Sequence, residues 1–114
     1  MAERFSDYES FWPYYVSEHR DPACRRLHFV GTGLVLGFAA AGALVSPWWL
    51  LGCPLAGYGF AWAGHWRFEK NRPATFTYPL WSLRADFRMF RKMLFRQMEA
   101  ELARADALFP TAPR

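Results

Sequence analysis

The sequence predicts an all-α membrane protein, in which a two-span transmembrane helical hairpin is flanked by an N-terminal interfacial helix and a C-terminal basic amphipathic helix. The chain of 114 residues has no Asp, Glu, Lys or Arg from Phe29 to Trp66. This uncharged run is about twice the roughly 20 apolar residues that one spanning helix needs. This separation of charged from apolar residues along the chain excludes a disordered chain, a disulfide-stapled secreted miniprotein and a conventional soluble domain. We expect one membrane-embedded domain over residues 1–114.

A proline divides the uncharged run into two arms. In Ser46-Pro47, the proline disfavours helical geometry in the serine and has no N–H to donate, so the chain should turn there. Each arm is too long and too continuously apolar to be a barrel strand. We predict a first span over residues 22–45 and a second over residues 47–66. The alternative is a very hydrophobic soluble pair of helices.

The basic residues predict the orientation of the hairpin. Four arginines precede the uncharged run, ten Lys or Arg follow it, and the turn at Ser46 has none. By the positive-inside rule, both termini should face the cytoplasm, which places the protein in the inner membrane if it is bacterial. Trp48 and Trp49 would then anchor the turn at the far interface.

The segment before the hairpin predicts an interfacial helix over residues 1–20. Its aromatic residues recur every three or four positions, and Ser6 and Glu9 have the spacing of a capping box. Asp21 followed by Pro22 is typical of a helix N-cap and first position, so the first span should begin there.

The segment after the hairpin predicts a basic amphipathic helix over residues 79–104. Apolar residues repeat there at spacings of three and four, with arginines on the other faces. The apolar positions are Leu80, Leu83, Phe87, Phe90 and Leu94. Such a helix should lie on an anionic membrane surface, so the lipid bilayer is an expected partner. We expect no nucleic acid, because no recognition motif accompanies the charge.

The three histidines can meet at one depth. His28 lies 18 residues before Ser46 and His65 lies 19 after it, so two helical arms bring both back to nearly the same level. His19 precedes His28 by nine residues with a proline between them, and Glu69 follows His65 by four. Imidazoles with a carboxylate suit Fe(II), Zn or another borderline divalent metal. The alternative is that the histidines are interfacial anchors and that Glu69 pairs with a nearby arginine or caps a helix.

The cysteines and glycines say less about a functional site than the histidines do. Cys24 and Cys53 would lie far apart in the bilayer, so we expect free thiols. Cys24 is close enough to His28 to be an extra ligand, although a packed thiol is favoured. Gly33-x-x-x-Gly37 allows close approach of helices, which favours packing within the hairpin and also permits a homodimer through the glycine-rich spans.

Two stretches carry a family resemblance. They are Tyr14-Tyr-Val-Ser-Glu-His19-Arg-Asp-Pro22, continuing to Arg26-Leu-His28-Phe-Val-Gly31, and Gly64-His65-Trp-Arg-Phe-Glu69-Lys-Asn-Arg-Pro73-Ala. With them the chain resembles the family of the fungal 2-hydroxy fatty acid dioxygenase. Fungal members are longer, with additional spans between the two motifs, and have Asn in place of Cys24. The short form resembles bacterial members.

The resemblance implies an Fe(II)-dependent membrane enzyme that uses dioxygen to shorten a 2-hydroxy fatty acid by one carbon. It places the iron on His19, His28 and His65. Glu69 would be a catalytic residue, either as a fourth ligand or as the acceptor that fixes the tautomer of His65. The fatty carboxylate would pair with Arg25 or Arg72. Two alternatives remain: a non-catalytic hairpin that binds lipid or scaffolds a partner, and a bis-histidine haem protein.

Overall fold

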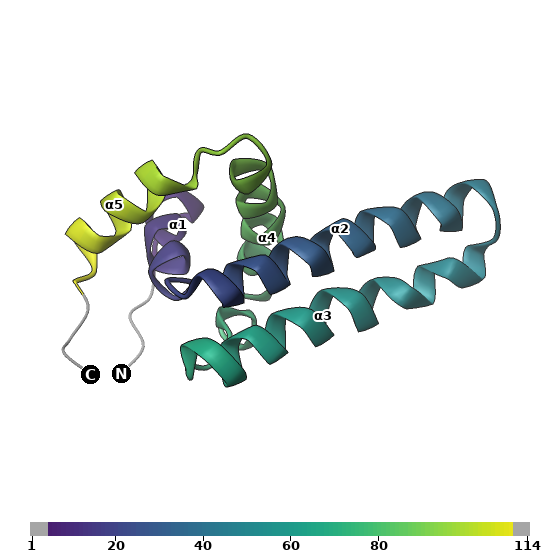
Figure 1. Ribbon diagram of the computed structural model, residues 1–114, viewed down its shortest axis with the longest axis horizontal. Helices are drawn as coiled ribbons and strands as arrows, with labels where there is room; N and C mark the ends of the chain where they lie inside the picture. The colour runs from purple at the N-terminus through teal and green to yellow at the C-terminus, as the bar shows by residue number, and fades with distance from the viewer. Residues whose placement is uncertain (1–4, 111–114) are drawn as a thin grey trace. The chain divides into compact units, whose positions relative to one another are not determined.

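The computed structural model describes residues 5–110, which form five α-helices joined by short turns and contain no strand (Figure 1). The predicted all-α fold class is therefore confirmed. The chain divides into two compact units. One is the hairpin, Asp21–Pro73, and the other combines the segment ending at Arg20 with the segment starting at Ala74. The single membrane-embedded domain stays a prediction.

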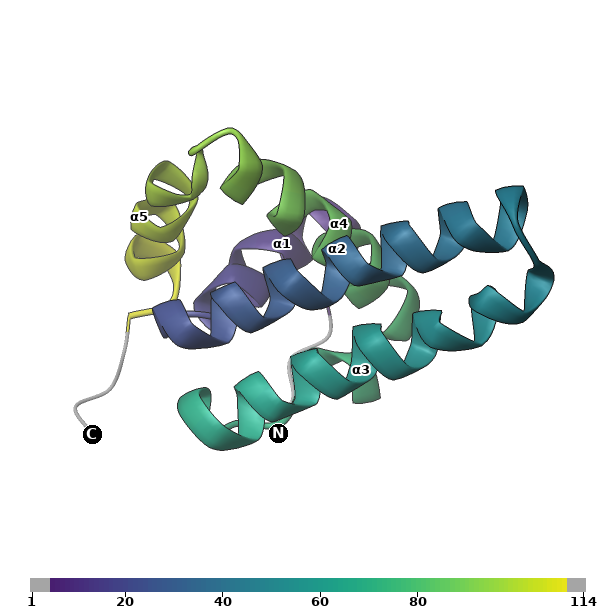
Figure 2. The same ribbon diagram turned by 45° about the vertical axis from the view of Figure 1, so that its right-hand side comes forward.

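The hairpin begins where the sequence predicts. The Asp21 side chain accepts the Ala23 N–H at 2.8 Å and caps α2 (Pro22–Leu44), with Pro22 in the first turn. The chain turns at Ser46, which is extended. The return arm is a 3-10 turn, Pro47–Leu51, then α3 (Gly52–Gly64) and a π-helical turn, His65–Glu69. Helices α2 and α3 run side by side in Figures 1 and 2.

The two arms differ in their capacity to span a membrane. Helix α2 has 23 residues and a mean hydropathy of 1.7 over its most apolar window, and it is the one described helix long and apolar enough to cross. Helix α3 has 13 residues, or roughly 20 Å at 1.5 Å per residue. Pro54 lies in its first turn and cannot donate the helical hydrogen bond to Leu50, so the α-helix starts late. The expected two-span hairpin is therefore not confirmed by helix length.

Glycine lets α2 and α3 approach closely at several positions, among them Gly31. A Cβ added at Gly31 would lie 2.8 Å from the Phe60 Cβ and 2.9 Å from the Ala56 carbonyl oxygen. A Cβ at Gly37 would meet nothing within 4 Å. Gly31 is therefore a point of close approach within the hairpin, and Gly37 of the expected motif is not.

Replacing Gly31 by alanine is expected to push α2 away from α3, because a backbone oxygen occupies the space of the new methyl group. We expect a loss of about 1–3 kcal/mol in the free energy of unfolding, measured in detergent by circular dichroism. The matched control is Gly37→Ala, which should change stability by less than about 1 kcal/mol and in the stabilising direction. Equal destabilisation by the two variants would show that the contact at Gly31 is not specific.

The second unit packs around its first helix. Helix α1 (Tyr8–Ser17) is capped by Asp7, whose side chain accepts the Ser10 N–H at 2.8 Å, rather than by the Ser6 of the expected capping box. Phe11, Trp12 and Val16 are completely buried. The helix expected over residues 1–20 is thus shorter and lies at the centre of a helical core, and residues 1–4 lie outside the described residues. Its place at a membrane interface stays a prediction.

The expected helix over residues 79–104 is two helices. Helix α4 (Pro79–Leu94) and α5 (Met98–Leu108) are separated at Arg96, which adopts a left-handed conformation with φ of 57° and so breaks the helical ladder. A short 3-10 turn, Ala74–Phe76, precedes α4.

Helix α4 packs on α1 through a different face from the apolar repeat that was expected to lie on a membrane surface. Ser82, Ala85 and Met89 are buried. By contrast, Leu80 is 79% exposed and Leu83 is 49% exposed. Small side chains fit under the aromatic residues of α1, and the larger leucines stay on the surface.

Helix α5 packs against α1 through polar contacts as well as apolar ones. The Trp12 indole N–H donates to the Glu101 carboxylate at 2.5 Å, and Arg20 pairs with Asp106 at 2.8 Å. These contacts join residues separated by more than eighty positions, so they close the unit around α1.

A carboxyl group in this unit makes stability depend on pH. The Tyr15 hydroxyl donates to Asp86. Burial raises the pKa of Asp86 from 3.8 to about 7, against the opposing effect of the Tyr15 hydrogen bond. Because the pKa of Asp86 is higher in the folded state than in the unfolded state, the folded state holds the proton more tightly. The protonated carboxyl therefore contributes to the free energy of unfolding at low pH, and this contribution is lost as pH rises from about 4 through about 7.

We therefore expect Asp86→Asn to raise the unfolding midpoint relative to the wild type above pH 7, by about 5 °C or more, and to have little effect below pH 4. Asparagine keeps the acceptor for Tyr15 and removes only the charge. Thermal unfolding of both proteins across this pH range measures the difference, and an offset that does not vary with pH would refute the role of Asp86.

Candidate metal centre

Two histidines of the hairpin meet as its two arms predict. His28 comes from the second turn of α2 and His65 opens the π-helical turn of the return arm. Their ring centroids are 5.0 Å apart and the rings are nearly perpendicular, at 88°. The residues are 4% and 2% exposed. Burial removes most of the water that would otherwise solvate two polar rings, so each needs partners for its nitrogens.

A backbone carbonyl fixes the tautomer of His28. Its Nδ1 lies 2.9 Å from the carbonyl oxygen of Cys24, one turn earlier in α2. A carbonyl oxygen can only accept, so Nδ1 carries the hydrogen and the lone pair of the neutral ring is on Nε2. A neutral imidazole with its lone pair on one nitrogen is the form that binds a metal ion.

An amide side chain fixes the tautomer of His65. Its Nδ1 lies 2.6 Å from the Asn71 Oδ1, six residues later. The chain reaches back because Lys70 adopts a left-handed conformation with φ of 59° and because the N–H groups of Lys70 and Asn71 both donate to the His65 carbonyl, at 2.6 and 3.2 Å. The result is again a ring with its lone pair on Nε2.

His19 repeats the arrangement of His28. It follows α1, is 1% exposed, and its Nδ1 lies 2.6 Å from the Tyr15 carbonyl oxygen four residues earlier. Its ring stacks on the Tyr15 ring at a centroid distance of 4.1 Å. The carbonyl acceptor gives His19 the same tautomer.

The three histidines form one group. Within residues 5–110, the candidate ligand atoms of His19, His28 and His65 all lie within 4.8 Å of one another. All three residues are buried, and in all three a carbonyl oxygen holds Nδ1 and directs the lone pair to Nε2. The donor set therefore fits a metal ion, because metal-binding histidines commonly give their second nitrogen to such an acceptor.

Glu69 and Cys24 are not members of this group. The buried Glu69 carboxylate accepts the backbone N–H of Asp21 and thereby ties the π-helical turn to the start of α2. The acceptor of the His65 Nδ1–H is the Asn71 amide oxygen, and a catalytic role of Glu69 stays a prediction. The Cys24 sulfur lies 3.6 Å from the His28 Nδ1, and neither Cys24 nor Cys53 forms a disulfide, as expected.

Sequence reasoning missed Asn71. It stands in the motif that carries the family resemblance, but in a regular α-helix a residue six positions after His65 lies about 9 Å further along the axis. Only the π-helical turn and the left-handed Lys70 bring it back.

The two arginines expected to bind substrate lie near the ends of the hairpin. Arg25 is partly exposed in the first turn of α2 and interacts electrostatically with Glu69 and Asp21, while Arg72 is exposed beyond the π-helical turn. Their contact with a substrate carboxylate stays a prediction.

Comparison with known proteins identifies the family. The family model described as 2-hydroxy-palmitic acid dioxygenase Mpo1-like matches residues 5–98. The chain belongs to the Mpo1-like family. Neither a curated protein nor a solved structure matches it. The matched range of this Mpo1-like protein includes all three histidines, Glu69 and Asn71, and the family resemblance seen in the sequence is confirmed.

Proposed function

We propose that this Mpo1-like protein is an Fe(II)-dependent dioxygenase that shortens 2-hydroxy fatty acids by one carbon. The observation that carries the proposal is the group of three buried histidines, each with its lone pair on Nε2. The description of the family supplies the class of reaction and of substrate. Iron is favoured over zinc because a reaction with dioxygen needs a metal that changes its oxidation state, which zinc does not.

His19, His28 and His65 would hold the metal through Nε2. Fe(II) bound there would supply open coordination positions and redox chemistry for dioxygen and for a chelating 2-hydroxy acid. The chain's own contribution is to keep the rings neutral and in place through the acceptors on Nδ1. Glu69 holds the turn that carries His65 against the start of α2. Arg25, on the same helix as His28, would pair with the fatty carboxylate and orient it.

The hairpin would place this chemistry at the membrane surface. We propose that α2 forms one span and the return arm, residues 47–69, a second, with both termini on the cytoplasmic side. Supporting this, Leu44, Trp48 and Leu55 are 84%, 79% and 77% exposed, an apolar surface that suits lipid better than water. A homodimer through the open glycine face at Gly37 is part of this proposal. The acyl chain of the substrate would remain in the bilayer.

The haem alternative is not favoured by this geometry. A porphyrin would have to lie between its two axial histidines, yet the His28 and His65 rings are in edge-to-face contact. The scaffold alternative does not explain why three buried rings share one tautomer and converge. Measurements of metal content and of turnover would distinguish a non-catalytic scaffold from an enzyme.

The test is oxygen uptake by the intact protein. The full chain, purified without oxygen in detergent and supplied with Fe(II), is mixed with 2-hydroxypalmitic acid or, as the matched control, palmitic acid. We expect about one iron per chain, and oxygen uptake with the one-carbon-shorter acid as product only when the 2-hydroxyl is present. Iron binding without uptake of oxygen would reject the activity, and absence of iron binding would reject the site.

A further inference from the structure

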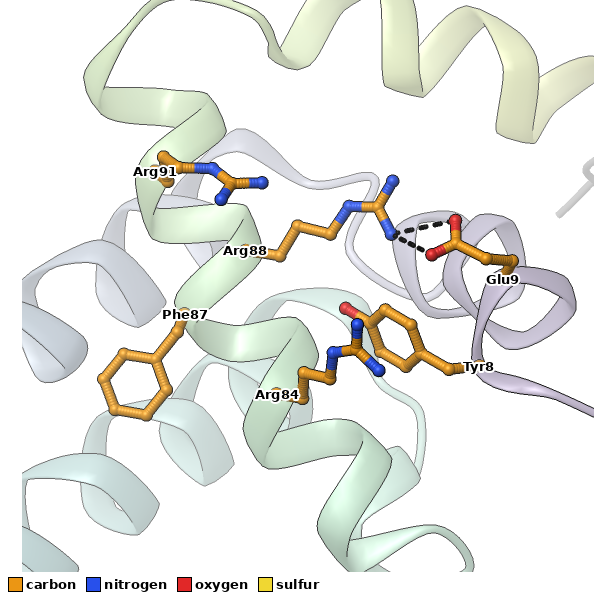
Figure 3. A pocket seen from close by; sticks show the side chains of 6 residues that line it. All are labelled: Tyr8, Glu9, Arg84, Phe87, Arg88 and Arg91. Atoms are coloured by element: carbon orange, nitrogen blue, oxygen red, sulfur yellow. Dashed lines mark hydrogen bonds and ion pairs between the residues drawn. The ribbon is translucent and has the colours of Figure 1, made fainter.

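A hollow of about 450 Å³ lies between α1 and α4 (Figure 3). Its walls are Tyr8, Glu9, Arg84, Phe87, Arg88 and Arg91. All six belong to the unit that packs around α1, and none takes part in the histidine group. The hollow is large enough for a charged headgroup rather than only for water.

The hollow is strongly basic. Its three arginines are spaced four and three residues apart on α4, so they project from one side of that helix. Arg88 pairs with the exposed Glu9 at 3.3 Å. One carboxylate against three guanidiniums leaves a surplus of two positive charges. The guanidinium group of arginine can donate two parallel hydrogen bonds to two oxygens of one phosphate, which favours a phosphate over a monatomic anion.

A buried hydroxyl in the wall of the hollow has no partner. Tyr8 is 7% exposed, and among the described residues its hydroxyl makes no hydrogen bond. The Arg84 guanidinium lies 4.0 Å from the centre of its ring, and Figure 3 shows the hydroxyl pointing toward α4 beside the arginine side chains. Such a group is costly in a folded protein unless a ligand satisfies it.

Apolar surface borders the basic hollow. On α4 the exposed Leu80 and Leu83 continue the face of Phe87, next to the arginine row on the helix surface. Leu80 also lines a second hollow of about 360 Å³, whose other walls include Phe5, Pro79 and Trp81. A ligand that fills both environments must have an anionic end and an apolar chain.

We propose that this hollow binds the phosphate headgroup of an anionic phospholipid, with an acyl chain lying along the exposed leucines of α4. Arg84 and Arg91 donate to the phosphate oxygens. Movement of the long Arg84 side chain from the Tyr8 ring onto the phosphate opens the Tyr8 hydroxyl to the same ligand. The unit would thus select anionic lipid by direct contact rather than by its general positive charge.

The test compares four ligands on the full-length protein in neutral detergent at physiological salt. They are dioctanoyl phosphatidylglycerol, dioctanoyl phosphatidylcholine, inorganic phosphate and a single-stranded oligonucleotide. We expect phosphatidylglycerol to bind at least about tenfold more tightly than the other three. Equal binding of inorganic phosphate would overturn the lipid assignment in favour of a small-anion site, and tighter binding of the oligonucleotide would overturn it in favour of nucleic acid.

Variants test the site itself. Arg84→Gln and Arg91→Gln should each weaken phosphatidylglycerol binding about fivefold to tenfold. The matched control Arg104→Gln, on the exposed surface of α5, should weaken it less than about twofold. Equal effects of the three variants would reduce the site to general electrostatic attraction and reject the proposal.

Tyr8→Phe separates binding from folding. It removes only the unpartnered hydroxyl, so we expect about threefold weaker phosphatidylglycerol binding with an unfolding midpoint that is unchanged or higher. Unchanged affinity would overturn the contact between Tyr8 and the headgroup. A loss of affinity accompanied by a lower midpoint would attribute the effect to structure and overturn that contact as well.

Discussion

Replacing His28 or His65 by alanine is expected to reduce bound iron from about one per chain to less than about a tenth, and oxygen uptake with 2-hydroxypalmitic acid by at least about 100-fold. Each substitution removes one Nε2 donor from a group whose ligand atoms lie within 4.8 Å of one another. His19→Ala should have the same effect. Two imidazoles cannot hold Fe(II) firmly against water, which explains the size of the expected loss.

Elemental analysis and an oxygen electrode measure the two quantities on the same samples. The matched control is Cys24→Ser, a change at a buried side chain that lies 3.6 Å from the His28 ring but outside the metal-binding group. It should keep its iron and most of its activity. Retention of iron by all three histidine variants, with their helical content intact, would reject the assignment of the site.

Replacing Asn71 by alanine is expected to weaken metal binding about 10-fold to 100-fold. Asn71 touches no metal in this proposal; it positions His65 by accepting the Nδ1–H at 2.6 Å. Without this acceptor the ring loses its fixed tautomer and orientation. Asn71→Asp keeps an acceptor and makes it anionic, so this variant should bind metal within about threefold of the wild type.

Anaerobic titration with Co(II), followed by visible absorption, gives the affinity without any requirement for turnover. Arg67→Gln, an exposed change on the same turn, is the matched control and should leave the affinity unaltered. If the alanine and aspartate variants lose affinity equally, the acceptor role is wrong and Asn71 serves only the shape of the turn.

Elements determined by local pattern could be predicted from the sequence. The start of α2 at Asp21 and Pro22 depends on capping chemistry, and the turn at Ser46 depends on the proline that follows it. The approach of His28 to His65 follows from two arms of nearly equal length. None of these features requires knowledge of what the helices pack against.

Elements determined by packing could not be predicted in the same way. The apolar repeat of α4 gave no sign that Ser82 and Ala85 would be buried against the large rings of α1, while Leu80 and Leu83 of that repeat remain exposed. The break between α4 and α5 at Arg96 likewise could not be predicted, because no proline or glycine marks it in the sequence. Periodicity records where apolar residues are, not which of them meet a partner.

The sequence by itself determined a helical hairpin, its turn, its family and the three histidines that should meet, because each depends on short-range chemistry or on distance along a helix. Only the tertiary structure decided that Asn71 holds His65, that Gly31 is a point of close approach, and that Tyr8 and three arginines line a basic hollow. These features depend on which side chains from separate segments come into contact, and that choice is made by the packing of the whole unit.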